Sequence, residues 1–330
     1  MSSESKKLSP AGREAREAFA QLAAEVAKVV VGQEEMVESL SLGLLTGGHV
    51  LLEGVPGLAK TLAVKTFASG LSARFSRIQF TPDLLPADLV GTRVYNAKSG
   101  DFSVSKGPVF AHVVLADEIN RAPAKVQSAL LEAMQEKHVT IGGETFDLEE
   151  PFLVLATQNP IETEGTYPLP EAQVDRFLFK TRVDYPSREQ EMEILQRAHG
   201  LSPQQPGRPV LKPRQVLEAR EEAASIYLDD KVLHYCVDLA RATRDPGSVG
   251  LGNLKPMIQF GASPRASLAL AASGRAHALL EGRGFVAPDD IKAVALRVLR
   301  HRVILSYEAE AEEMTADQVV SEVLKKVKTP

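Results

Sequence analysis

The sequence contains no tryptophan, a single cysteine among 330 residues, and aromatic residues at only 5%. One thiol, that of Cys236, excludes an internal disulfide and any zinc site built from cysteines. Its neighbours Val232, Leu233, Val237 and Leu239 follow a helical pattern, so we interpret Cys236 as a buried apolar thiol. The scarcity of aromatic residues weakens the case for a surface that stacks nucleic-acid bases.

Excess positive charge and long apolar runs are also absent. The formal net charge is −5, which gives no electrostatic reason to expect sequence-independent binding of nucleic acid. No run of residues is long and apolar enough to span a bilayer, and the polar N-terminus has no apolar stretch behind it. We therefore expect a cytoplasmic protein. The length and the 44% hydrophobic content suffice for two domains with a sizeable core.

The most informative stretch follows the apolar run at residues 49–52. A strand that passes through a glycine-containing turn into a helix directs backbone N–H groups and the positive helix end at one place. Lysine and threonine at the helix start then suit phosphate binding and Mg²⁺ coordination. The predicted phosphate-binding residues are Gly54, Val55, Pro56, Gly57, Leu58, Ala59, Lys60, Thr61 and Leu62, with Thr61 also a predicted metal ligand.

Ala59 is the one departure from the phosphate-loop pattern G-x-x-x-x-G-K-[ST], which has glycine before the lysine. The alternative interpretation is an ordinary strand–turn–helix connection with a solvated lysine. However, Lys60 in the first turn would oppose the helix dipole unless an anion lay there. The phosphate site is therefore the favoured interpretation.

Two carboxylates follow the buried strand predicted at residues 113–116. Side chains alternate along a strand, so we expect Asp117 and Glu118 to diverge. Asp117 can then hold Mg²⁺ through water, while Glu118 faces the terminal phosphate as the base for an attacking water. Two solvated surface acids are the alternative.

A further buried strand is predicted at residues 152–157, and it leads to Asn159. An amide at the end of a strand beside the two acids can orient the water between Glu118 and the terminal phosphate. The pair Asn159-Pro160 could otherwise be only a turn. The position of the amide after the acid-bearing strand favours the first interpretation.

Two arginines are further candidates. Arg176 follows Asp175 at the end of a short helix that begins near residue 169, and the pair is either a surface ion pair or an arginine presented to a neighbouring subunit's nucleotide. Sequence spacing does not separate these two possibilities. Arg265 follows a capping Ser263 and Pro264, which places it in a first helical turn, where a cation is misplaced unless a phosphate is near.

The order of elements predicts an α/β domain at residues 10–186. Residues 1–9 are polar and expected to be disordered, and helices follow near 10–31 and 36–46. An insertion at about 84–110 contains a short helix and a hairpin at 94–104, which is either a plain surface hairpin or a functional loop. A second hairpin is predicted at 137–148, and a strand at 177–179.

A smaller all-α domain is predicted at residues 187–330. Ser187 and Gln190 form a capping box, and a proline-rich linker follows at about 200–213. The periodicity then predicts helices at about 213–226, 229–243, 264–281, 288–300 and 315–327.

Taken in order, these motifs resemble those of the AAA+ ATPases and, more narrowly, the MoxR family. The resemblance extends from about residue 14 to residue 306 and is carried by residues 54–61, 116–123, 156–160 and 169–173. Alanine before the lysine is usual in that family, so Ala59 does not count against the site. The resemblance implies a P-loop AAA+ core, whose parallel sheet is flanked by helices, followed by an all-α lid. It also implies an insert in helix 2 and a hairpin before the sensor 1 strand.

The same resemblance implies a role for each candidate residue. Val31 and Gly32 would lie near the adenine, Lys60 and Thr61 would bind phosphate and Mg²⁺, and Asp117 would be the Walker B aspartate. The remaining roles would be catalytic base for Glu118, sensor 1 for Asn159, arginine finger acting in trans for Arg176, and sensor 2 acting in cis for Arg265.

At the level of the assembly, the resemblance implies a ring, typically hexameric, with Mg²⁺-ATP between subunits. Family members are associated with von Willebrand factor A domain proteins and with their chaperone-like maturation. Two alternatives remain open from the sequence. One is a nucleic-acid-remodelling motor, because the helix-2 insert also occurs in DNA helicases, and the other is a nucleotide-gated binding scaffold with little turnover.

Overall fold

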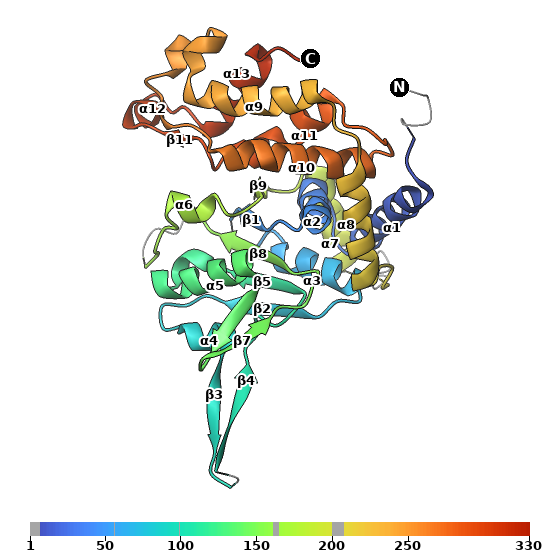
Figure 1. Cartoon of the computed structure of the whole chain (residues 1–330), viewed down its shortest axis with the longest axis vertical. Helices are drawn as coiled ribbons and strands as arrows, with labels where there is room; N and C mark the ends of the chain where they lie inside the picture. The colour runs from blue at the N-terminus through green and yellow to red at the C-terminus, as the bar shows by residue number, and fades with distance from the viewer. Residues whose placement is uncertain (1–6, 56, 99, 161–164, 200–207) are drawn as a thin grey trace. The chain divides into compact units, whose positions relative to one another are not determined.

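The computed structural model describes residues 7–55, 57–98, 100–160, 165–199 and 208–330, which form two compact units (Figure 1). The sheet unit comprises Ala18–Arg176 and Thr181–Leu217, and the helical unit comprises the chain up to Glu17, Phe177–Lys180 and Glu218–Pro330. The domain boundary predicted from the sequence lies at residue 186 instead. Within the proline-rich segment predicted at 200–213, residues 200–207 lie outside the described residues.

A five-stranded sheet with the order β2-β5-β8-β1-β9 organises the sheet unit. β2 pairs with β5, β5 with β8, and β8 with β1, all in parallel. The apolar strands β5 and β8 are buried almost throughout, as expected for a parallel sheet covered on both faces. The strands are β1 Val50–Glu53, β2 Phe75–Gln79, β5 Val113–Asp117, β8 Leu153–Gln158 and β9 Phe179–Arg182.

The strand predicted at residues 177–179 in fact begins at Phe179, so this prediction is wrong by two residues. The physical reason is local. The carbonyl oxygens of Phe177 and Leu178 accept hydrogen bonds from the side chains of His301 and Arg302. These groups are therefore satisfied outside the sheet.

Helices cover the sheet and connect its strands. α2 packs against β1, and α3 packs against β2 and β5. The predicted amphipathic first helix is confirmed, with Phe19, Leu22 and Val26 buried, but it ends at Ala27 and not near residue 31. The helices are α1 Pro10–Ala27, α2 Glu34–Thr46, α3 Lys60–Gly70, α4 Pro86–Val90, the 3-10 helix Ile119–Arg121, α5 Ala124–Glu136, α6 Glu171–Val174 and α7 Arg188–Ala198.

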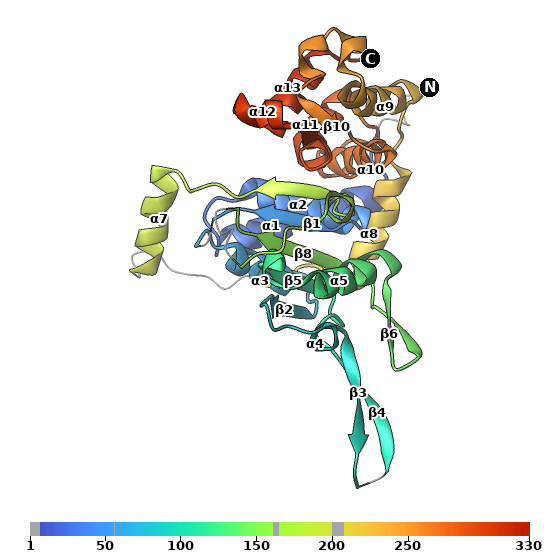
Figure 2. The same cartoon turned by 90° about the vertical axis from the view of Figure 1, so that its left-hand side faces the viewer.

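Both predicted hairpins are confirmed. The first consists of β3 (Gly91–Asn96) and β4 (Asp101–Lys106), and it projects away from the sheet beyond α4 in Figures 1 and 2. Its rings of Tyr95 and Phe102 lie 5.1 Å apart between centroids although both side chains are more than half exposed, at 55% and 59%. The second hairpin consists of β6 (His138–Ile141) and β7 (Glu144–Asp147).

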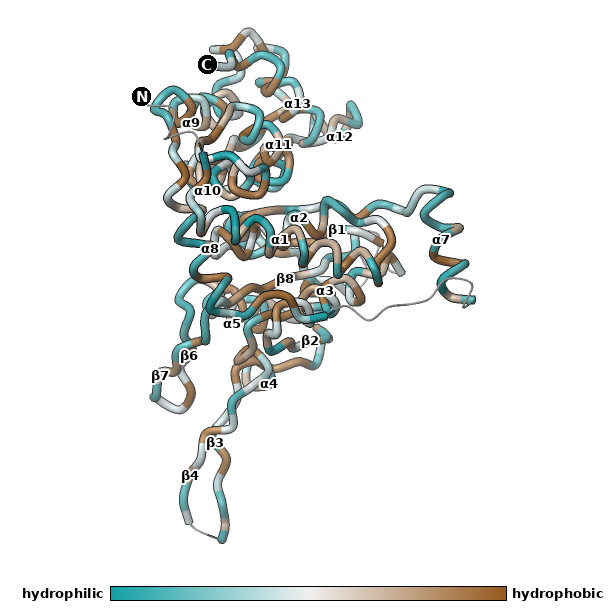
Figure 3. Tube along the Cα trace, turned by 90° about the vertical axis from the view of Figure 1, so that its right-hand side faces the viewer, coloured by the Kyte–Doolittle hydropathy of each residue, from teal (hydrophilic) through white to brown (hydrophobic). Residues whose placement is uncertain are grey.

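α7 is a single helix at the end of an extended segment of the sheet unit (Figures 2 and 3). Ser187 accepts a hydrogen bond from the N–H of Gln190, and the Gln190 side chain accepts one from the N–H of Ser187, so the predicted capping box is confirmed. Hydrophobic and hydrophilic residues alternate along α7 in Figure 3. The Arg197 guanidinium donates to the carbonyl oxygens of Ala27 and Lys28 at 3.3 Å and 2.9 Å, and this contact attaches α7 to the end of α1.

The helical unit contains the helices predicted after residue 213. It also contains a short antiparallel pair of strands and the helix α12, which the sequence analysis does not predict. Its elements are α8 Pro213–Ser225, which begins in the sheet unit, α9 Asp230–Arg244, the 3-10 helices Pro246–Val249 and Gly252–Leu254, β10 Ile258–Phe260, α10 Pro264–Leu280, α11 Pro288–Leu299, β11 Ile304–Leu305, α12 Tyr307–Ala311 and α13 Ala316–Lys326.

Three residues of this unit bear on the sequence predictions. Leu8 is buried and the hydroxyl of the exposed Ser9 donates a hydrogen bond to Glu222, so these two residues have defined contacts, whereas disorder is expected from the sequence through residue 9. Cys236 is buried as predicted, and burial raises the pKa of its thiol to about 12. In the part of the chain that the structure describes, none of the helices has the length and apolar character to cross a membrane.

Candidate functional site

The loop between β1 and α3 has an unusual backbone shape. An added Cβ at Gly54 would lie 2.6 Å from the carbonyl oxygen of Val183, so this position requires glycine. Gly57 and Ala59 have left-handed conformations, with φ of 87° and 55°. Left-handed residues in a tight turn direct backbone N–H groups toward a shared concavity that suits an anion. Pro56 lies outside the described residues.

A pocket of about 400 Å³ opens at the start of α3. Its lining combines the three groups of residues that the sequence singles out, namely the loop, the two acids and the amide. Val55 is not among the lining residues that the structure describes. The lining residues are Gly57, Leu58, Ala59, Lys60, Thr61, Leu62, Asp117, Glu118, Thr157 and Asn159.

Lys60 is the cation of this pocket. Its ammonium donates a hydrogen bond to the carbonyl oxygen of Gly54 at 2.5 Å, so the side chain folds back over the loop. Burial lowers the pKa of Lys60, while the charges of Asp117 and Glu118 act in the opposite direction. A bound polyphosphate would give this half-buried ammonium the anionic partner that it lacks in the loop.

Thr61 and Asp117 lie together, as expected of a Mg²⁺ site. The Thr61 hydroxyl donates to Asp117 Oδ2 at 3.4 Å, and Arg77 Nη2 donates to the same oxygen at 2.7 Å. A hydroxyl and a carboxylate are hard oxygen ligands of the kind that Mg²⁺ takes together with phosphate oxygens and water. The described residues contain no group of three or more His, Cys, Asp or Glu that could hold a metal ion by themselves.

Glu118 differs from its predicted geometry. The strand ends at Asp117, and Glu118 adopts a left-handed conformation with φ 57° and ψ 52°. The two carboxylates therefore diverge because the backbone turns after Asp117, not because side chains alternate along one strand. Glu118 Oε2 accepts hydrogen bonds from Gln79 Nε2 at 2.9 Å and pairs with Arg121 Nε at 3.1 Å.

Three side chains around the acids are absent from the sequence predictions. Arg77 and Gln79 lie on β2, and Gln79 stands opposite Asp117 in the register between β2 and β5. Thr157 lies on β8, donates to Asp117 Oδ1 at 2.6 Å and accepts the N–H of Glu118 at 2.8 Å. A single pattern could have indicated Thr157, since it is the polar residue that ends the apolar run of β8.

A second, more apolar pocket of about 220 Å³ adjoins the first and shares Gly57, Leu58, Ala59 and Leu62 with it. Val31, predicted to lie near a base, is among its lining residues. Gly32 lies beside this wall with φ 69°, and an added Cβ there would lie 2.8 Å from Gln190 Nε2. The sequence analysis does not predict the contribution of α7. The other lining residues are Val29, Val30, Gln33, Pro186, Ile194, Arg197 and Ala198.

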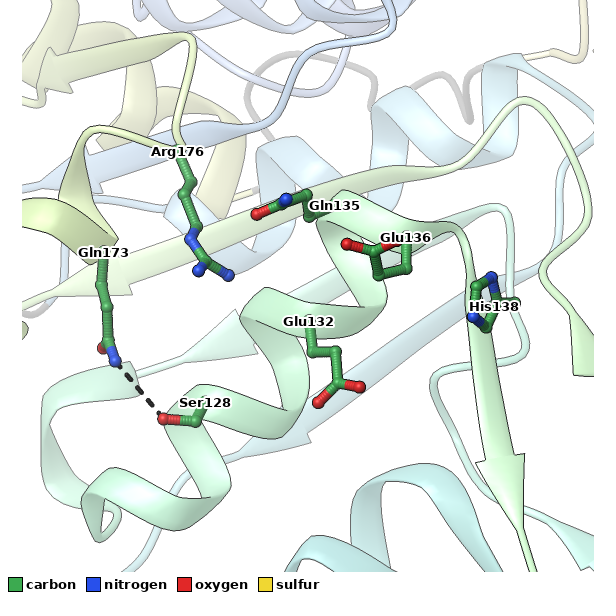
Figure 4. Close-up of a pocket in the computed structure, with 7 residues that line it drawn as sticks. All are labelled: Ser128, Glu132, Gln135, Glu136, His138, Gln173 and Arg176. Carbon is green, nitrogen blue, oxygen red and sulfur yellow. Dashed lines mark hydrogen bonds between the residues drawn. The ribbon is translucent and has the colours of Figure 1, made fainter. Parts of the chain in front are cut away.

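Arg176 lines a different pocket of the sheet unit, of about 530 Å³. Figure 4 shows its guanidinium pointing toward α5, beside Gln135 and across from Glu132. Arg176 Nη1 donates to the carbonyl oxygen of Leu131 at 3.2 Å. The lining residues are Ser128, Glu132, Gln135, Glu136, His138, Gln173 and Arg176. Arg176 is thus not among the described lining residues of the phosphate pocket in its own chain.

Arg265 lies where the sequence predicts within its helix. The hydroxyl of Ser263 accepts the N–H of Arg265 at 3.3 Å, and Pro264 is the first residue of α10. Arg265 is exposed in the first turn of that helix, within the helical unit.

Comparison with known proteins agrees with this geometry. The family profile described as "ATPase family associated with various cellular activities (AAA)" matches residues 49–179, and the AAA lid domain profile matches residues 253–323. The chain is 53% identical to Chaperone MoxR1 of Mycobacterium tuberculosis over 93% of this chain and 81% of that protein. The chain belongs to the MoxR family of AAA+ ATPases.

Other relatives match along almost their full length. Protein YeaC of Bacillus subtilis is 45% identical over 92% of each chain, and Protein MoxR of Methylorubrum extorquens is 32% identical over 94% of each chain. The crystal structure of a candidate ATPase from Cytophaga hutchinsonii superposes with a TM-score of 0.91 at 49% identity and covers 97% of each chain. The predicted family, the α/β core with a helical lid, and the ATPase class are therefore confirmed.

Proposed function

We propose that this MoxR-family ATPase hydrolyses Mg²⁺-ATP at the interfaces of a ring, typically a hexamer, and uses the turnover to remodel a protein client. The observation that carries the proposal is the single pocket that joins Lys60, Thr61, Asp117, Glu118 and Asn159. These residue types are the ones that in-line attack of water on a terminal phosphate requires.

Each residue of the pocket has a distinct proposed role. Lys60 leaves the Gly54 carbonyl and neutralises phosphate charge. Thr61 and Asp117 hold Mg²⁺, which when bound draws charge from the phosphate oxygens. Glu118 accepts a proton from the attacking water, and Asn159 orients that water.

The adjoining apolar pocket is the proposed base site. Its volume of about 220 Å³ and its valine-rich wall suit a purine ring, and it shares residues with the phosphate pocket. Val31 and Gly32 would lie beside the base, and Ile194 of α7 would close it.

Arg176 is proposed to act in trans on the nucleotide of the next subunit. It lines its own pocket on the face formed by α5 and α6, as Figure 4 shows, and a guanidinium suits a transition state whose charge is spread over phosphate oxygens. Arg265 is proposed to act in cis from the lid.

The proposed client is a protein, and a von Willebrand factor A domain protein is the candidate that family membership suggests. The projecting β3–β4 hairpin supports a protein client, because it exposes Val94, Tyr95 and Phe102. A relative at 53% identity is named a chaperone. The cytoplasmic location remains a prediction from the sequence.

Glu118→Gln tests the catalytic assignment directly. We expect the variant to bind ATP with unchanged affinity and to hydrolyse it about 10²- to 10⁴-fold more slowly, because a general base is lost while the charge-binding groups stay. Glu144→Gln, at an exposed position of β7, is the matched control and should hydrolyse ATP normally. Turnover by Glu118→Gln close to that of the control would overturn the assignment.

The same variant tests the biological role. Glu118→Gln loaded with ATP should retain a protein client, which mass spectrometry of co-purified proteins would identify. Stimulation of the unmodified protein's ATPase by single-stranded DNA, with no protein client retained, would instead support a nucleic-acid motor.

A further inference from the structure

The residues directly after Arg176 are held by a cluster of basic side chains in the helical unit. The carbonyl oxygen of Phe177 accepts hydrogen bonds from His301 Nε2 at 3.1 Å and from Arg302 Nη2 at 2.7 Å. The carbonyl oxygen of Leu178 accepts one from Arg302 Nη1 at 3.1 Å. The two residues that accept these bonds and the two that donate them all belong to the helical unit. Arg176 is the last residue of the sheet unit before the chain enters the helical unit.

Two more basic side chains extend this cluster along the segment. Arg300 Nη1 donates to the carbonyl oxygen of Lys180 at 3.2 Å, and its Nε donates to Asp317 at 3.0 Å. The Arg297 guanidinium lies 5.5 Å from the centroid of the Phe179 ring. We call Phe177–Lys180 the anchor segment, and Arg297, Arg300, His301 and Arg302 the anchor cluster.

The anchor segment is buried and its bonds are directional. Phe177 and Phe179 are fully buried, and His301 and Arg302 are only 6% exposed. A buried cation is costly unless it is hydrogen-bonded, and here main-chain carbonyl oxygens supply the bonds. An apolar contact alone would tolerate a shift along the segment, whereas charged donors aimed at successive carbonyls fix its path.

Arg176 is therefore fixed from both sides. In the sheet unit its guanidinium donates to the Leu131 carbonyl oxygen and its N–H to that of Gln173, both at 3.2 Å. On the other side it is bonded to Phe177 of the anchor segment.

We propose that Arg302, together with His301 and Arg300, is a positioning residue that sets how Arg176 is presented to the neighbouring subunit's nucleotide. This inference rests on the proposed trans role of Arg176. The helical unit carries both Arg265 and the anchor cluster.

Subunit mixing separates this role from a purely structural one. Arg302→Met alone should lower kcat at least about tenfold with the KM for ATP within about twofold, because a displaced group loses catalysis without losing binding. Mixed rings with Lys60→Ala should recover hydrolysis, since Lys60→Ala subunits present a correctly placed Arg176 to the intact pocket of Arg302→Met subunits. Arg283→Met is the matched control, because that guanidinium pairs with Asp290 instead, and it should keep normal kcat.

The outcomes distinguish the trans role of Arg176 from the positioning role of Arg302. Failure of Arg176→Ala and Lys60→Ala to complement each other in verified mixed rings would overturn the trans role and the inference with it. If that pair complements but Arg302→Met with Lys60→Ala does not, the positioning role alone is wrong. If Arg302→Met does not fold, Arg300→Met, which loses only the bonds to Lys180 and Asp317, should show the same rescue, and its absence would overturn the inference.

Discussion

The hydroxyl of Thr157 donates to Asp117 Oδ1 at 2.6 Å. The same hydroxyl accepts the N–H of Glu118 at 2.8 Å, and Thr157 is only 1% exposed. One buried side chain on β8 therefore fixes the carboxylate of the first acid and the backbone of the second. Both bonds cross from β8 to the end of the neighbouring strand β5.

Thr157→Val keeps the shape of the side chain and removes both bonds. We expect the free energy of unfolding to fall by about 1–3 kcal/mol, because two buried polar groups lose a partner. We expect kcat for ATP to fall about 10- to 100-fold, because misplacing catalytic groups slightly is costly. Denaturant unfolding and steady-state ATPase measure the two effects. Thr157→Ser retains the hydroxyl and should stay close to the unmodified protein, and a Val variant with normal kcat would contradict the positioning role.

Arg77→Met should increase the apparent affinity for Mg²⁺. Arg77 donates to the Asp117 oxygen that Thr61 also contacts, so its guanidinium competes with a metal ion there. Arg77 is about half exposed, and an exposed ion pair contributes about 0.2–1 kcal/mol, so the Mg²⁺ concentration for half-maximal ATPase should fall about 1.5- to 5-fold. A Mg²⁺ titration at fixed ATP measures this half-maximal concentration. A weaker Mg²⁺ response would show that Arg77 orients Asp117 instead.

Ala59 adopts a conformation that favours glycine, with φ 55°. Ala59→Gly should leave ATP affinity unchanged and alter the free energy of unfolding by less than about 1 kcal/mol, because relief of strain offsets the added freedom of the unfolded chain. Ala59→Val should lower both the ATP affinity and the free energy of unfolding, since a branched Cβ is poorly tolerated at positive φ. Thermal unfolding with and without ATP distinguishes the two variants, and a Val variant that binds ATP normally would contradict the required loop shape.

His301 should make the protein less stable in mild acid. Burial, with help from Arg302, Lys180 and Arg300, holds the pKa of His301 well below its ordinary value. The unfolded chain binds a proton as pH falls through about 6.5 while the folded chain does not, so stability is lost below that pH by up to ~1.4 kcal/mol per pH unit. His301→Gln should reduce this dependence when unfolding is compared at pH 8 and pH 5.5. An unchanged difference between the two pH values would contradict the assignment.

The sequence predicts most helices, the central strands and the phosphate loop because their signals are local. Lys60 and Thr61 follow a strand and start a helix, and Asn159 follows an apolar run, so each is recognisable within about ten residues. Arg77 could not be predicted in the same way, and the position of Thr157 after the apolar run of β8 indicates a polar residue but not its partner. Their contacts with Asp117 depend on the register between strands that are distant in sequence.

Other differences arise from the backbone and from side chains distant in sequence. The left-handed conformation of Glu118 is a single-residue feature that no periodicity reveals. The place of α7 in the sheet unit depends on Arg197, whose bonds to Ala27 and Lys28 join residues about 170 positions apart. The delayed start of β9 likewise follows from the distant side chains of His301 and Arg302.

The buried thiol of Cys236 makes the protein a favourable background for site-specific labelling. With a pKa of about 12, only about one thiol in 100,000 is ionised at pH 7, so alkylating probes should react with it very slowly. A cysteine introduced at the exposed Asp101, near the tip of the β3–β4 hairpin, would then be the reactive site of each subunit. A fluorophore there would report movement of the hairpin during ATP turnover without prior removal of a native cysteine.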